Sequence, residues 1–76
     1  MVILGMVTRN REWDSDPTRR NFSIEGLDLI PDKDRVPVET LPPVGSLVKA
    51  DVSSAWQADK KRFLFFLNGI REANLS

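Results

Sequence analysis

Apolar residues in the first quarter of the chain follow a strand-like pattern that gives way to a polar stretch. Val2–Thr8 is rich in β-branched and apolar residues, which favours a strand. Gly5 within it indicates a bulge or a close backbone approach. The polar residues 9–20, which contain Asp14-Ser15-Asp16-Pro17, predict a turn or an excursion from the sheet.

The middle of the chain alternates apolar and polar residues in two phases. Phe22 and Ile24 alternate with polar neighbours, and after Gly26 the apolar positions shift to Leu27 and Leu29. This shift of one residue predicts a single bent strand over 21–30 with a bulge at Gly26.

Three further segments complete the middle of the chain. Residues 31–34 predict a second turn. Residues 35–41 predict a weak edge strand or an extended loop, because Pro37 cannot donate a ladder hydrogen bond. Residues 47–52 predict a short strand with four apolar positions.

The last third of the chain supports two interpretations. Ser54 stands three residues before Gln57 in a capping-box pattern, while the run 63–67 is apolar on all sides and favours a buried strand. Asn68-Gly69 is a strong signal for a tight hairpin turn. We therefore predict a helix at about 54–61, a strand at 62–67 and a strand at 70–75. The alternative is one helix over 55–67 that ends at Asn68-Gly69.

These elements predict one β-rich α+β domain over residues 1–76. Short strands at this spacing are typical of a small curled antiparallel sheet or a partly open barrel, and an OB-like or SH3-like barrel fits the length. The alternative assignment gives a sheet with one longer C-terminal helix.

The composition excludes several kinds of chemistry. The 76 residues include no cysteine and no histidine, so the chain has no disulfide, no thiolate nucleophile, no imidazole base and no Cys or His zinc ligand. Asp32-Lys33-Asp34 lacks the glycine and the closing glutamate of a calcium loop. We expect a protein that is not an enzyme and that uses no metal, cofactor or small-molecule substrate.

The charges balance overall but are spread unevenly. Eleven basic and eleven acidic side chains give a net charge of zero, yet residues 21–40 hold two basic and five acidic side chains. Nonspecific nucleic-acid binding usually requires a clear positive excess, so protein partners are favoured over nucleic acid.

No apolar run approaches the roughly 20 residues of a membrane span. The N-terminal apolar run lacks the positive residue that precedes the apolar region of a secretory signal. We expect a cytoplasmic protein without membrane contact.

Two groups of residues are candidates for binding. The first combines arginines and aromatic residues, which are common at binding hot spots and also suit single-stranded nucleic acid. It comprises Arg9, Arg11, Trp13, Arg19, Arg20 and Phe22. In the competing interpretation Trp13 covers the core, and the arginines pair with Glu12, Asp14 and Asp16.

The second candidate surface comprises Trp56, Lys60, Lys61 and Arg62. On the predicted helix Trp56 and Lys60 share a face and would form a cationic, aromatic contact site. The favoured interpretation places Trp56 in the core and leaves the lysines as a solvated face.

These features favour a non-enzymatic protein-binding module, a small regulator or accessory factor that occupies a surface of a larger protein assembly. Phage-type regulators of host machinery such as RNA polymerase, which act on transcription, are one such class, and this expectation rests on no motif. The alternative is a single-stranded nucleic-acid-binding OB-like domain. It would use Trp13, Phe22 and Trp56 for stacking, and Arg19, Arg20 and residues 60–62 for phosphates. A structural subunit of a larger complex is the third hypothesis.

Overall fold

The computed structural model describes residues 1–16 and 19–73 and shows an all-β domain. Five strands and one 3₁₀ turn follow in chain order, and the predicted β-rich character is confirmed. They are β1 (Val2–Glu12), β2 (Arg20–Ile24), β3 (Leu27–Pro31), η1 (Val38–Thr40), β4 (Leu47–Gln57) and β5 (Arg62–Glu72).

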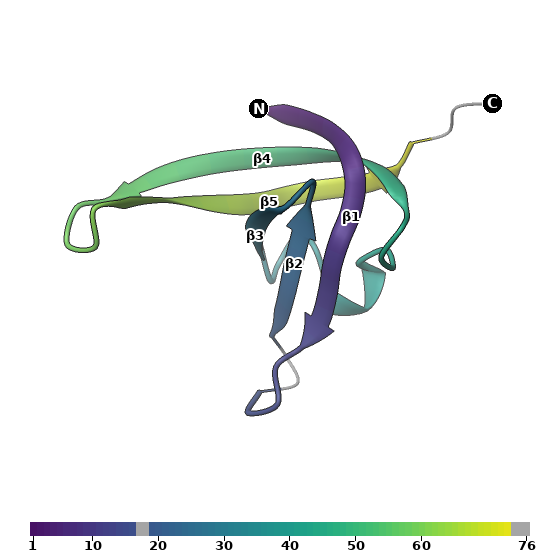
Figure 1. The fold of residues 1–76 in the computed structure, drawn as a ribbon, viewed down its shortest axis with the longest axis horizontal. Helices are drawn as coiled ribbons and strands as arrows, with labels where there is room; N and C mark the ends of the chain where they lie inside the picture. The colour runs from purple at the N-terminus through teal and green to yellow at the C-terminus, as the bar shows by residue number, and fades with distance from the viewer. Residues whose placement is uncertain (17–18, 74–76) are drawn as a thin grey trace.

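The strands close into a barrel in the order β1-β2-β3-β5-β4, with β4 returning to β1 (Figure 1). All pairings are antiparallel except that of β3 with β5, which joins only Ile30 to Phe66 and Pro31 to Leu67. Closure leaves few exposed sheet edges on the barrel itself, which limits edge-to-edge aggregation.

The core lies inside this barrel and uses one face of each strand. Inward residues alternate with outward ones, so that Phe22 and Ile24 of β2 are buried, as are Val48, Ala50 and Val52 of β4. The segment between β3 and β4 contributes two further side chains. Among the described residues, the buried apolar set is Val7, Phe22, Ile24, Leu29, Val36, Leu41, Val48, Ala50, Val52 and Leu67.

The predicted helix at 54–61 and the alternative helix at 55–67 are both wrong. Residues 54–57 belong to β4, residues 58–61 form the turn, and β5 begins at Arg62. Ser54 pairs with Phe65 and Trp56 with Phe63 across the hairpin. The helix formers between Ala55 and Lys61 have only weak intrinsic preferences, whereas pairing with the apolar run 63–67 supplies cross-strand contacts along the whole ribbon.

Asn68-Gly69 is not a hairpin turn, and this prediction is also wrong. Both residues lie inside β5, where Asp51 pairs with Gly69 and Val52 pairs with Leu67. Asn68 is therefore the extra residue of a bulge, and its amide donates to the Ser53 hydroxyl at 2.9 Å. β5 continues without a break to Glu72, and positions 74–75 of the predicted strand 70–75 lie outside the described residues.

The segment 21–30 forms a hairpin rather than one bent strand. Ile24 pairs with Leu27, which leaves Glu25 and Gly26 as a two-residue turn with φ values of 51° and 81°. Positive φ at both positions is the type I′ geometry that matches the twist of paired strands. The phase shift at Gly26 therefore marks a chain reversal.

Two other predicted boundaries change. The first strand runs on to Glu12, so the polar residues 9–12 are part of β1. The segment 35–41, predicted as a weak edge strand or an extended loop, is a connection that contains η1, and its Val36 and Leu41 are buried in the core.

The hairpin of β4 and β5 extends well past the barrel, to the left in Figure 1, while the end of β1 that leads to β2 points downward. The molecule is accordingly elongated, with extents of 44 × 28 × 22 Å. Within the described residues, no helix is long and apolar enough to cross a membrane.

Candidate functional site

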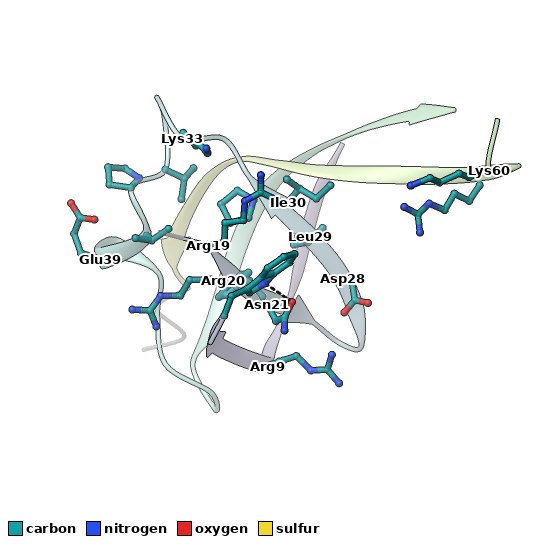
Figure 2. Close-up of a pocket in the computed structure, with 17 residues that line it drawn as sticks. Arg9, Arg19, Arg20, Asn21, Asp28, Leu29, Ile30, Lys33, Glu39 and Lys60 are labelled. Atoms are coloured by element: carbon teal, nitrogen blue, oxygen red, sulfur yellow. Dashed lines mark hydrogen bonds between the residues drawn. The ribbon is translucent and has the colours of Figure 1, made fainter. Parts of the chain in front are cut away.

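A groove runs across the outer face of β2 and β3, and we call it the β2–β3 groove (Figure 2). Its volume is about 970 Å³. Residues from the β1–β2 loop line one part, the connection 33–39 a second, and Lys60 and Arg62 at the β4–β5 hairpin a third. Side chains far apart in the sequence therefore face the same space.

The outward side chains of β2 and β3 form the floor of this groove. Asn21, Asp28 and Ile30 line it and alternate along their strands with the buried Phe22 and Leu29. The floor thus combines an amide, a carboxylate and an apolar side chain.

Trp13 and Arg19 form the part of the groove contributed by the β1–β2 loop. The Trp13 backbone N–H donates to the Arg19 carbonyl at 3.2 Å, and the indole Nε1 donates to Asn21 Oδ1 at 2.9 Å, the dashed line in Figure 2. The Arg19 guanidinium lies 5.4 Å from the centre of the indole and 3.4 Å from a carboxylate oxygen of Asp16. Trp13 is 40% exposed, and two ion pairs of the competing interpretation are present, that of Arg19 with Asp16 and that of Arg20 with Glu12.

Arg20 is held at the start of β2 by two neighbours on β1. One terminal guanidinium nitrogen donates to Asn10 Oδ1 at 3.2 Å and the other lies 3.9 Å from Glu12. Asn10 in turn donates to the carbonyl of Pro42 at 2.8 Å, which ties the β3–β4 connection to β1. The guanidinium Nε is buried without a partner in the described part of the chain.

Charge is strongly segregated around the groove. Six lining residues are cationic (Arg9, Arg19, Arg20, Lys33, Lys60 and Arg62) and two, Asp28 and Glu39, are acidic. The rest of the chain carries the other five of its eleven basic side chains and the other nine of its eleven acidic ones. A neutral protein therefore presents a positive groove and a negative remainder.

Four of these cations have no ion pair among the described residues: Arg9, Lys33, Lys60 and Arg62. They are the groups best placed to meet an external anion, since no internal carboxylate competes for them. Arg19 and Arg20 carry ion pairs that are partly solvent-exposed and weak.

The other face of the β4–β5 hairpin is aromatic, and we call it the hairpin aromatic face. It consists of Trp56, Phe63 and Phe65. Trp56 meets Phe63 edge-on with ring centres 5.0 Å apart, and Phe65 packs against the core. Trp56 and Phe63 are 55% and 57% exposed, so the placement of Trp56 in the core is wrong. Because neighbouring cross-strand pairs face opposite ways, these rings point away from Arg62.

The two candidate surfaces of the sequence meet in one groove. Arg9, Trp13, Arg19 and Arg20 of the first line it together with Lys60 and Arg62 of the second. Arg11 and Lys61 do not line it, Trp56 lies on the hairpin aromatic face, and Phe22 is 1% exposed. No ring face of Phe22 is therefore open for a base to stack on.

Sequence reasoning missed the floor residues Asn21, Asp28 and Ile30 and the rim residue Lys33. The signal that identifies the three floor residues is the alternation of buried and polar residues on either side of Gly26. It identifies the outward side chains once 21–30 is understood as two paired strands.

No group of three or more carboxylates among residues 1–16 and 19–73 is arranged to hold a metal ion. Comparison with known protein families, with curated proteins and with solved structures finds no match to this chain.

Proposed function

We propose that this chain is a single-stranded nucleic-acid-binding module that holds the strand in the β2–β3 groove. The observation that carries the proposal is the concentration of six cations and two acids in the groove of a chain whose net charge is zero. Phosphate neutralisation supplies most of the affinity of such modules, so the local excess matters more than the total.

The strand order supports the OB-like barrel over the SH3-like one. The parallel pairing of β3 with β5 breaks the simple up-and-down order that an SH3-like barrel follows, and gives a five-stranded Greek-key barrel. OB barrels use the face of strands 2 and 3 and the loops after strands 1 and 4 for oligonucleotides. Fold alone does not establish function, so the proposal depends on the charge and chemistry of the groove.

The groove also carries groups that suit bases. Trp13 is 40% exposed and fixed by its hydrogen bond to Asn21, which keeps the ring oriented before a strand binds. Stacking of a base on such a ring contributes about 1–3 kcal/mol and tolerates any sequence. Ile30, 45% exposed on the floor, adds an apolar surface.

Matched arginines and lysines test this proposal. Arg9 lines the groove and Arg11, two residues further along β1, does not; likewise Lys60 lines it and Lys61 does not. We expect Arg9→Ala and Lys60→Ala to weaken binding of a fluorescein-labelled single-stranded DNA in an anisotropy titration. Each should also reduce the slope of log K against log salt by about 0.7. Arg11→Ala and Lys61→Ala should leave the slope within error of the unmodified protein.

If both variants of a matched pair weakened binding equally, binding would depend only on the total charge of the protein. That result would contradict the proposal that the groove is the binding site. No binding at low salt would overturn the proposed function altogether.

A second candidate function, the protein-binding module, is favoured by the hairpin aromatic face. Exposed tryptophan and phenylalanine side chains on a protruding ribbon are common in protein interfaces, where they bury large areas at low entropic cost. A larger assembly such as RNA polymerase remains a predicted partner for this face. The regulatory role and the structural-subunit hypothesis are predictions as well.

A further inference from the structure

The floor of the β2–β3 groove carries one carboxylate among the cations. Asp28 of β3 pairs with Ser23 of β2, and the buried Ser23 hydroxyl donates to Asp28 Oδ1. Asp28 is exposed and has no other hydrogen bond or ion pair within the described part of the chain, so its Oδ2 is an open acceptor. The other acid of the groove, Glu39, belongs to η1 and lies on the opposite side of the view (Figure 2).

A carboxylate in this position orients a nucleic acid. It repels phosphates, which therefore favour Arg9, Lys33 and Lys60, and the bases are left to contact the floor. A carboxylate oxygen accepts hydrogen bonds and does not donate them, so it pairs with an exocyclic amino group. Thymine and uracil lack that group, and their one ring donor on the pairing edge, N3–H, lies between two carbonyl oxygens that Asp28 repels.

Asn21 supplies the complementary donor on the neighbouring strand. Its Oδ1 accepts the hydrogen bond from the Trp13 indole, so the two N–H groups of its amide remain for a ligand. Cytosine presents an amino donor beside ring-nitrogen and carbonyl acceptors, which matches one acceptor at Asp28 and one donor at Asn21. Ile30 offers an apolar surface next to them.

From this juxtaposition we infer that the groove discriminates among bases, preferring cytosine to thymine and uracil, and that Asp28 determines the preference. The inference rests on the proposed function and adds specificity to it. A good hydrogen bond of a side chain to a base edge is associated with discrimination of about tenfold or more.

The experiment compares labelled oligo(dC) and oligo(dT) of equal length by anisotropy at fixed low salt. The unmodified protein should bind oligo(dC) about tenfold more tightly. Asp28→Asn keeps an oxygen for the Ser23 hydroxyl, and it removes both the charge and the free carboxylate acceptor. We expect the ratio of the two dissociation constants to fall to near one. Both affinities should rise, because a negative charge is lost.

Glu39→Gln is the matched control, since it removes the other groove carboxylate away from the floor. It should raise both affinities and leave the ratio unchanged. The inference is overturned if the unmodified protein binds both strands equally, if Asp28→Asn keeps the ratio, or if Glu39→Gln lowers it as much. In each of these cases the proposed function stands, whereas failure of both strands to bind would overturn the proposed function as well.

Discussion

At the scale of single residues, Gly5 is the glycine with the least room for a side chain. A Cβ at Gly5 would lie 2.5 Å from Glu25 Cγ and 3.0 Å from Ile24 Cγ2. Glu25 cannot move away freely, because its Oε1 accepts the Met6 backbone N–H at 2.9 Å and its backbone N–H donates to the Met6 carbonyl. The atoms that crowd Gly5 are therefore side-chain atoms of Ile24 and Glu25, whereas the sequence pattern predicted a bulge or a close backbone approach.

Gly5→Ala should accordingly destabilise the protein by about 1–3 kcal/mol, the usual cost of forcing extra atoms into a packed site. Urea denaturation followed by tryptophan fluorescence measures the change. Gly69→Ala is the control: its Cβ would meet nothing closer than Asp51 Cβ at 3.9 Å. That substitution should be neutral or slightly stabilising.

A double substitution tests the cause of the Gly5 effect. If Glu25 Cγ is the main obstacle, Gly5→Ala should cost clearly less in a Glu25→Ala background than in the unmodified chain. An equal cost in both backgrounds would point to Ile24 or to the backbone instead.

At the scale of secondary structure elements, the β4–β5 turn contains a residue with an unfavourable conformation. Lys61 has a φ of 51°, a left-handed value that non-glycine residues adopt at a cost of about 1–2 kcal/mol. Asparagine tolerates this region better. Lys61→Asn should stabilise the protein by about 0.5–1 kcal/mol in urea denaturation. Lys60→Asn, at a neighbouring position without a positive φ, should not.

The same hairpin shows where prediction from sequence failed. Ala55–Arg62 has good helix formers, and Asn68-Gly69 has the composition of a turn, so local preferences point to a helix and a later hairpin. The structure instead places the turn at 58–61 and a bulge at Asn68. The turn at 58–61 brings Trp56 beside Phe63, and further along the hairpin Val52 pairs with the buried Leu67. The helix and turn preferences of single residues contain neither pairing. The strand 47–52, by contrast, was predictable because its own alternation matches its burial.

At the scale of the whole molecule, the sequence predicted part of the candidate site. Composition identified the arginines and lysines as candidate contacts, but the zero net charge argued against nucleic acid. That argument considers only the total charge, whereas barrel closure sorts the charges in space. It gathers Arg9, Lys33 and Lys60, which are distant in sequence, into one groove and leaves nine of the eleven acids outside it. Net charge describes the chain, whereas binding depends on the local field.

The two faces of the projecting hairpin suggest two independent binding activities in one small molecule. Arg62 points toward the groove, while Trp56 and Phe63 point away from it. We therefore expect Arg9→Ala to weaken retention of nucleic acid from a bacterial lysate and to leave any nuclease-resistant protein partner in place. The double variant Trp56→Ala with Phe63→Ala should show the reverse pattern.

Mass spectrometry of the retained proteins, with and without nuclease, and anisotropy with single-stranded DNA measure the two activities separately. The aromatic variant is expected to stay folded, because both rings are more than half exposed and their mutual contact contributes only about 0.5–1.5 kcal/mol. Loss of single-stranded DNA binding in a folded aromatic variant would mean that the strand continues from the groove over the hairpin. The hairpin aromatic face would then belong to the nucleic-acid site, and the protein-binding module would lose the observation that favours it.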